Sequence, residues 1–221
     1  MSRFDAVLFD CDGVLVDSEP ITNGVLREML QELGWTMTSE ECMRLFVGKA
    51  VKDEAEAIES RTGKPVTAQW LAQFRGRRNA ALERNLVPIR DAEVAVKALY
   101  AALDGRIACA SGADLFKVKL QLDKVGLMRW FDGRIFSGHD LPRSKPFPDV
   151  YLAAAAALGV PPQRCAVEED TVTGVTAGAA AGAMVFGYCP PGAAHVAPQA
   201  LRDAGAAAIF TDMADLPGLL V

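Results

Sequence analysis

Short apolar runs recur along this chain, and each lacks the polar alternation of a strand that is half exposed to solvent. Strands buried on both faces and separated by helices indicate a parallel sheet that is covered by helices on both sides. We therefore expect an α/β fold with a Rossmann-like parallel sheet as its core. The runs expected to form strands are AVLF (6–9), RIACA (106–110), RCAV (164–167), AMVFG (183–187) and AAIF (207–210). The segments between them with helical spacing of apolar residues are 91–103, 113–125, 148–158, 173–182 and 212–220.

One long segment departs from this alternation. Residues 17–86 contain several stretches with helical patterning and no convincing strand. We interpret them as a helical domain inserted after the first strand into a core made of residues 1–16 and 87–221. The two connections to the core, near 16–19 and 86–90, are candidate hinges, because movement between two such parts is absorbed at a few connecting residues.

Composition and charge exclude several classes of protein. The net charge of −5 argues against a nucleic-acid-binding protein, which usually carries a basic face. The Ala- and Gly-rich tract near 172–187 is broken by glycines and is not a membrane span. The N-terminal apolar run is too short for a signal peptide, so we expect a cytoplasmic protein with no membrane partner. The five cysteines have no paired spacing, which favours reduced thiols over disulfides or zinc ligands.

Carboxylates must carry any chemistry here, because two histidines are too few for a site built on several imidazoles. Acidic residues follow two of the expected strands: Asp10 and Asp12 follow the first, and Glu169 and Asp170 end the run that begins RCAV. The carboxyl ends of parallel strands meet at one edge of a sheet, where ligands bind. We therefore expect these acids to gather there with Ser111, in CASGAD, and Lys145, in SKPFPD.

Such a cluster needs a counterion. Asp10, Asp12, Glu169 and Asp170 would place about four negative charges against the one positive charge of Lys145. At separations of about 4–6 Å these carboxyl groups would raise one another's pKa values unless a cation neutralised them. Oxygen ligands suit a hard divalent ion, and a site that keeps water molecules suits Mg²⁺. The same cation would let a phosphate dianion approach the acids.

Four motifs in order carry a resemblance to a known family. They are D-x-D-G-[VT]-L-x-D-S, a Ser or Thr after a strand, K-P-x-P, and E-D-[ST]-x-x-G. Together they resemble the haloacid dehalogenase-like hydrolase superfamily, within it the beta-phosphoglucomutase-like and sugar-phosphate phosphatase group. The helical domain directly after the first motif resembles the type I cap of that superfamily. The resemblance covers essentially the whole chain.

The resemblance implies a role for each motif residue. Asp10 would attack phosphorus to form an aspartyl-phosphate. Asp12 would protonate the leaving alkoxide and then activate water, which requires it to titrate near the working pH. Ser111, Gly112 and Lys145 would bind the phosphoryl oxygens. The Mg²⁺ ligands would be Asp10, the carbonyl of Asp12, Glu169 and Asp170.

Some acidic and polar residues favour a structural interpretation. Strand alternation turns Glu168 away from Glu169, so we expect a supporting role for it and no metal ligation. Ser111 could also cap the helix that follows it. Asp17 and Ser18 are expected to shape the hinge, without direct chemistry.

Substrate choice should depend on the helical domain. Arg78 matches a family position that supplies a cationic substrate contact, and Lys49 is a second candidate, followed by Lys52. A cationic pocket would suit a second anionic group, such as the carboxylate of a phosphorylated sugar acid.

The sequence thus predicts a Mg²⁺-dependent phosphatase acting on a small sugar phosphate or sugar-acid phosphate, as a monomer or weak homodimer. A beta-phosphoglucomutase-type mutase is the alternative, although Thr22 and Val51 stand where the mutases carry a histidine and an arginine. A phosphoaccepting receiver domain is a second alternative, which the chain length and the helical domain disfavour. Release of phosphate from a sugar phosphate would separate an enzyme from a receiver.

Overall fold

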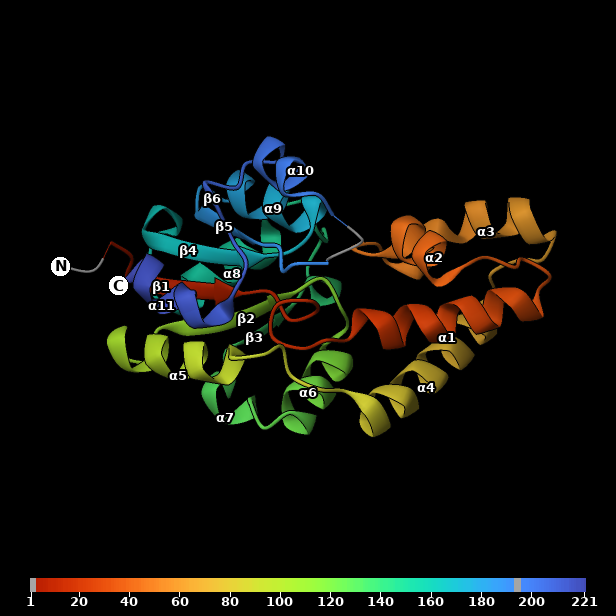
Figure 1. Cartoon of the computed structure of the whole chain (residues 1–221), viewed down its shortest axis with the longest axis horizontal. Coiled ribbons are helices and arrows are strands. Elements are labelled where there is room, and N and C mark those ends of the chain that lie inside the picture. The colour runs from red at the N-terminus through yellow and green to blue at the C-terminus, as the bar shows by residue number, and fades with distance from the viewer. Residues whose placement is uncertain (1–2, 193–195) are drawn as a thin grey trace.

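The computed structural model describes residues 3–192 and 196–221. Its centre is a parallel sheet of six strands in the order β3-β2-β1-β4-β5-β6. This order confirms the expected Rossmann-like α/β fold (Figure 1). The strands are β1 Ala6–Phe9, β2 Ile107–Ser111, β3 Ile135–Ser137, β4 Cys165–Glu169, β5 Met184–Tyr188 and β6 Ala208–Phe210.

The sequence did not predict β3. It is a three-residue edge strand, and two of its residues are half-buried, so it lacks the apolar run that marks the other strands. Its pairing with β2 in parallel register, Ser111 opposite Ser137, is what defines it as a strand. A segment this short depends on its neighbour and has no local signal of its own.

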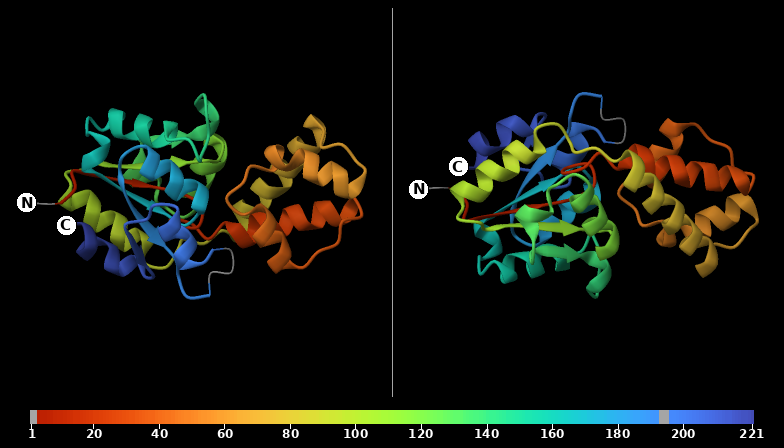
Figure 2. Two further views of the ribbon diagram at one scale, coloured as in Figure 1. Left: turned by 90° about the horizontal axis from the view of Figure 1, so that it is seen from above. Right: turned by 90° about the horizontal axis from the view of Figure 1, so that it is seen from below.

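Helices cover both faces of the sheet (Figure 2). One face packs against α5 (Ala92–Ala102), α6 (Leu115–Lys124), α7 (Met128–Phe131) and α11 (Leu216–Leu220), through residues such as Val96, Val118, Phe131 and Leu216. The other packs against α8 (Asp149–Ala157), α9 (Val172–Ala180) and α10 (Pro198–Asp203), through residues such as Tyr151, Val175 and Leu201. Short 3₁₀ turns complete the connections: η2 (Gly138–Asp140), η3 (Pro162–Arg164) and η4 (Met213–Asp215). Burial on both faces explains why the strands read as unbroken apolar runs.

The segment between β1 and α5, residues 17–86, consists of helices joined by loops and contains no strand, and we call it the helical insert. It contains α1 (Glu19–Glu32), α2 (Ser39–Phe46), η1 (Val51–Glu54), α3 (Ala55–Thr62) and α4 (Ala68–Asn85). Its helices enclose an apolar cluster of their own, which includes Leu26, Leu30, Phe46, Ile58 and Phe74. In Figure 1 the insert lies at the end of the core opposite the two termini. A separate core of this kind supports our proposal that the insert is a cap domain.

The two chain connections to the insert run side by side. Val16 forms an antiparallel bridge with Pro88, and the Asp17 amide donates to the Val87 carbonyl at 3.0 Å. The Ile89 amide donates to the Leu15 carbonyl at the same distance. These paired crossings coincide with the two stretches that the sequence marks as hinges. Within the described residues, no helix is long and apolar enough to cross a bilayer.

Candidate active site

The strand order places a topological switch point between β1 and β4. From β1 the chain proceeds to β2 and β3 on one side, and then returns to β4, β5 and β6 on the other. Ligands bind outside the carboxyl ends of the strands at such a point. Asp10 directly follows β1, and Glu169 ends β4 with Asp170 next to it. These acids therefore lie together at the carboxyl ends of β1 and β4, as the geometry of parallel strands predicts.

Lys145 lies at the centre of the cluster. Its ammonium donates to Asp10 Oδ1 and to Glu169 Oε1, each at 2.6 Å, and all three side chains are buried. Burial alone would lower the pKa of Lys145, but the charges of Asp10 and Glu169 reverse this effect and raise it. Lys145 is therefore a fixed cation beside the carboxylate that the resemblance designates as the nucleophile.

The second carboxylate in contact with Lys145 has several donors of its own. Glu169 Oε1 also accepts from the Tyr151 hydroxyl at 2.7 Å, and Oε2 accepts from the backbone amides of Asp170 and Thr171 at 3.1 and 3.3 Å. The Thr171 hydroxyl donates to the same oxygen at 3.1 Å. Glu169 is thus held rigidly, and it in turn orients Lys145.

Three carboxylates converge closely enough to hold one metal ion. Oxygens of Asp10, Glu169 and Asp170 all lie within 4.8 Å of one another, and the three residues are buried. Burial raises the pKa of Asp10 well above its usual range, Lys145 opposes the rise, and the neighbouring charges of Glu169, Asp170 and Asp12 add to it. Oxygen-only donors with excess negative charge fit a hard divalent cation. The Asp12 carboxylate does not belong to this group of three. That the backbone carbonyl of Asp12 binds the metal stays a prediction.

Two glycines make room for these carboxylates. A Cβ at Gly13 would lie 2.0 Å from Asp170 Oδ2, and the residue has φ +76°. A Cβ at Gly174, in the first turn of α9, would lie 1.8–2.1 Å from the Glu169 carboxylate. Neither position can accept a side chain without displacing a member of the acidic cluster. This explains the glycines in D-x-D-G and E-D-[ST]-x-x-G.

We expect Gly174→Ala to destabilise the fold and to reduce metal binding, although alanine in a helix normally stabilises by about 1 kcal/mol. The reason is the overlap of the new methyl group with Glu169. Gly76→Ala is a matched control, because Gly76 is also helical and a Cβ there has no neighbour within 4 Å. Thermal unfolding should show Tm falling in the first variant and rising slightly in the second. A rise in both would contradict the close approach of Gly174 to Glu169.

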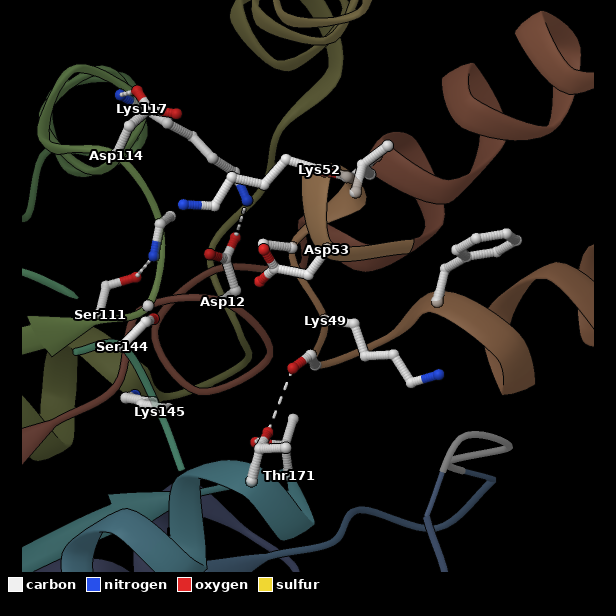
Figure 3. A pocket seen from close by; sticks show the side chains of 18 of the residues that line it. Asp12, Lys49, Lys52, Asp53, Ser111, Asp114, Lys117, Ser144, Lys145 and Thr171 are labelled. Carbon is white, nitrogen blue, oxygen red and sulfur yellow. Dashed lines mark hydrogen bonds and ion pairs between the residues drawn. The ribbon is translucent and has the colours of Figure 1, made fainter. Parts of the chain in front are cut away.

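Asp12 is held by three donors that come from different parts of the chain. Its Oδ1 accepts from Lys117 Nζ at 2.7 Å, from Gln121 Nε2 at 2.8 Å and from the Ser18 hydroxyl (Figure 3 shows the Lys117 contact). Burial would raise the pKa of Asp12, but the Lys117 charge and these hydrogen bonds outweigh it and lower the pKa to about 2. The expectation that Asp12 titrates near working pH is therefore wrong for this state of the protein. Ser18 does more than shape the hinge, since it contacts the Asp12 carboxylate directly.

Four members of the site were not predicted from the sequence: Lys117, Gln121, Tyr151 and Thr171. The sequence contained a weak signal for Lys117 and Gln121. They are four positions apart on the helix that follows Ser111, so they share a helix face directed at the strand ends. Tyr151 gave no comparable signal, since one aromatic residue in an alanine-rich helix is typical of core packing.

Ser111 and Gly112 lie where the sequence expects them: Ser111 is the last residue of β2, and Gly112 directly follows it. The Ser111 hydroxyl accepts from the Ala113 amide at 3.0 Å. The helix cap is Asp114, whose side chain accepts from the Lys117 amide at 2.9 Å, so the alternative role of Ser111 as the N-cap is wrong. Ser111 and Gly112 both line a cavity of about 430 Å³ that also contacts Asp10, Asp12 and Lys145. Its volume suits a small-molecule ligand.

Glu168 stays apart from the acidic cluster among the described residues. It is fully buried, and burial raises the pKa of its carboxyl group well above the usual range. Burial of this kind disfavours the charged form of the carboxyl group. This agrees with the prediction that Glu168 is not a metal ligand.

The helical insert supplies the other side of the cavity (Figure 3). Lys49 and Arg78, the two residues predicted to contact substrate, both line it. Lys49 Nζ lies 3.4 Å from Glu54, and the buried Arg78 donates to Asp114 at 3.0 Å and to Asn79. Both predicted cations are therefore already paired with carboxylates of this chain.

Comparisons with known proteins agree with this geometry. A family model described as haloacid dehalogenase-like hydrolase matches residues 4–182. The 6-phosphogluconate phosphatase of Escherichia coli K12 is 32% identical over 191 residues, covering 86% of this chain and 84% of the relative. Hexitol phosphatase B of the same organism is 32% identical, covering 80% of this chain and 79% of its own length. A hydrolase of the same family from Deinococcus radiodurans, solved with bound phosphate and sodium, is 35% identical with a TM-score of 0.81, covering 100% of this chain and 99% of that one.

Proposed function

This chain belongs to the haloacid dehalogenase-like hydrolase family and is a phosphomonoester hydrolase, and we propose that it hydrolyses a small sugar phosphate or sugar-acid phosphate with Mg²⁺. The observation that carries the proposal is the convergence of Asp10, Lys145, Glu169 and Asp170 at the switch point of the sheet. A nucleophilic carboxylate, a fixed cation and a set of metal ligands are the parts that phosphoryl transfer requires.

In the proposed first step an Asp10 carboxylate oxygen attacks phosphorus. A bond forms between that oxygen and phosphorus while the bond from phosphorus to the sugar oxygen breaks, leaving an aspartyl-phosphate. The leaving alkoxide takes a proton from Asp12. Because the contacts in this structure keep Asp12 ionised, this step requires Asp12 to gain a proton and to weaken its contact with Lys117 when substrate binds.

In the proposed second step water attacks the phosphorus of the aspartyl-phosphate. Asp12, now a carboxylate, accepts the proton of the attacking water. The bond between the Asp10 oxygen and phosphorus breaks, which releases inorganic phosphate and restores Asp10. Lys145 and Ser111 would hold the phosphoryl oxygens during both steps and stabilise their negative charge. The helical insert would exclude bulk water from the reacting groups.

Mg²⁺ would be held by Asp10, Asp170 and the Asp12 carbonyl, with Glu169 as a direct or water-mediated ligand, and would supply positive charge to the phosphoryl oxygens. We expect EDTA to abolish phosphate release and Mg²⁺ to restore it. In a thermal unfolding assay, Mg²⁺ should raise Tm because it binds the folded state alone. Asp170→Asn should lose most of this shift, whereas Asp132→Asn, at an exposed position, should retain it. Full turnover in EDTA would rule out the metal-dependent mechanism.

The relatives support sugar phosphates as the substrate class, since two of them are a 6-phosphogluconate phosphatase and a hexitol phosphatase. The direct test is a phosphate-release screen over sugar phosphates, sugar-acid phosphates, phosphoglycolate and nucleotides. A preference for nucleotides would contradict the proposal.

The alternatives are less well supported. The two Escherichia coli relatives are phosphatases. By the family resemblance, Thr22 and Val51 align near the positions at which mutases carry a histidine and an arginine. Analysis of products from beta-glucose 1-phosphate with a bisphosphate primer would detect mutase activity. The receiver interpretation has lost its basis, because the matching family is one of hydrolases.

A further inference from the structure

Two cations that line the cavity have no acidic partner. Lys117 and Lys145 are paired with the catalytic carboxylates, and Lys49 and Arg78 are paired with Glu54 and Asp114. Lys52 and Arg75 also line the cavity, yet neither forms an ion pair within residues 3–192 and 196–221. Of the cationic groups that remain available to a ligand, Lys52 was the third candidate from the sequence, and Arg75 was not predicted.

Lys52 and Arg75 come from separate elements and line the same cavity as His139 of the core. Lys52 belongs to η1 and Arg75 to α4, both in the helical insert, whereas His139 lies in η2, directly after β3. Burial of the imidazole is the largest cause of the lowered pKa of His139, and the charges of Lys52, Arg75 and Arg78 lower it further. Figure 3 shows the Lys52 side chain extending from the insert into the pocket. The three side chains thus line one cavity at the boundary between insert and core.

The charge in the part of the cavity around His139 is mainly positive. Of the four charged groups that act most strongly on His139, three are cations, and the fourth, Asp114, is already bound to Arg78. Asp53 is the remaining acid next to Lys52, and it is exposed to solvent. A neutral sugar hydroxyl would gain little from this arrangement. An anionic group would gain two charge-assisted hydrogen bonds and one from the neutral imidazole.

Exposed lysines and arginines are often merely solvated, and both side chains are exposed here. Two observations argue for a ligand in this case. The two cations line one cavity together with the half-buried imidazole of His139, and the same cavity contains the Asp10 carboxylate. A molecule whose phosphate lies at Asp10 would direct its far end into the remainder of this cavity.

We propose that the substrate carries a second anionic group, a carboxylate or a phosphate, at the end remote from the scissile phosphate, and that Lys52, Arg75 and His139 bind it. This inference rests on the proposed phosphatase function and deepens it, because it assigns specificity to three residues outside the catalytic motifs.

The test uses three ligands that differ at one carbon: glucitol 6-phosphate, 6-phosphogluconate and glucitol 1,6-bisphosphate. At carbon 1 they carry a neutral CH₂OH group, a carboxylate and a phosphate. Their dissociation constants are measured by calorimetry with Mg²⁺ on the Asp10→Asn protein, which binds without turnover. We expect at least one of the two ligands with a second anionic group to bind about tenfold or more tightly than glucitol 6-phosphate. The tighter of the two identifies the anion as carboxylate or phosphate.

Substitutions then assign the residues. In Asp10→Asn protein that also carries Lys52→Gln and Arg75→Gln, the preference for the second anion should fall by about tenfold or more, and His139→Gln should reduce it by a smaller factor. Arg77→Gln is the matched control, since Arg77 is on the same helix, pairs with Glu32 and does not line the cavity. An unchanged preference in the double variant, or equal binding of all three ligands, would overturn the inference.

The same ligands separate this inference from the proposed function. If the wild-type protein releases phosphate from glucitol 6-phosphate as efficiently as from the two others, the phosphatase proposal stands and the second-anion site is wrong. If it releases phosphate from none of them, nor from p-nitrophenyl phosphate, the phosphatase proposal fails. The calorimetric comparison still decides whether the three residues bind an anion.

Discussion

Asp10→Asn is expected to lower kcat for phosphate release by about 10⁴-fold or more, because an amide cannot form the aspartyl-phosphate. The variant should nevertheless fold. Asp10 is buried among Glu169, Asp170 and Asp12, and this environment raises the pKa of its carboxyl group. Asparagine removes one of the mutually repelling charges and keeps an oxygen that can accept from Lys145.

The measurement is steady-state phosphate release together with thermal unfolding in the absence of metal. Tm should equal or slightly exceed that of the wild type. Asp132→Asn, which changes an exposed acid in the same chemical way, should leave kcat unaltered. Substantial turnover by a correctly folded Asp10→Asn protein would disprove the nucleophile assignment.

Lys145→Met should impair both activity and stability. Lys145 is buried and lies 2.6 Å from both Asp10 and Glu169, so its loss leaves two buried carboxylates without their cation. Removing one partner of a buried ion pair costs about 3–5 kcal/mol. The loss of a fixed positive charge at the transferring phosphoryl group should lower kcat by a further ~10²–10³-fold. Lys97→Met, at an exposed position in α5, is the control and should change neither quantity.

The stability defect of Lys145→Met should depend on pH. In the wild type the pKa of Lys145 is raised in the folded state. Its contribution to the stability of the fold is therefore fully present below the unfolded-state pKa of about 10.4, and it is lost only as pH rises through the higher folded-state pKa. In the variant the pKa of Asp10, already raised by burial, rises further. Stability of the variant therefore falls as pH rises from about 4 through that folded pKa. Urea unfolding at pH 5 and pH 8 should show the larger difference from wild type at pH 8, and a difference that grows toward pH 5 would contradict the ion-pair assignment.

Much of the fold was predictable because its signals are local. Five of the six strands coincide with apolar runs, and the four helices of the insert with helical patterns. The start of α2 needs no tertiary information either, because the Thr38 side chain accepts a hydrogen bond from the Glu41 amide within one helical turn. The sixth strand was missed because its three residues depend on pairing with β2.

The catalytic motifs were predictable for a related reason. Each is a contiguous stretch at the end of a strand, and the geometry of parallel sheets brings such ends together whatever separates them in the sequence. The order of strands and helices was therefore enough to predict the placement of four site residues: Asp10, Ser111, Glu169 and Asp170. Lys145 was placed by its motif, K-P-x-P, in the loop that precedes α8.

The sequence by itself thus determined the sheet, the helical insert and the identity of the acids at the switch point. Tertiary structure alone decided which charges neutralise one another. Lys117 and Asp12 are 105 positions apart, yet their contact is the largest of the causes that lower the pKa of Asp12. Arg78 was predicted to bind substrate, but folding pairs it with Asp114 and leaves Lys52 and Arg75 for a ligand. The physical reason is that a charged side chain interacts with its nearest opposite charge in space, and spacing along the chain does not encode that distance.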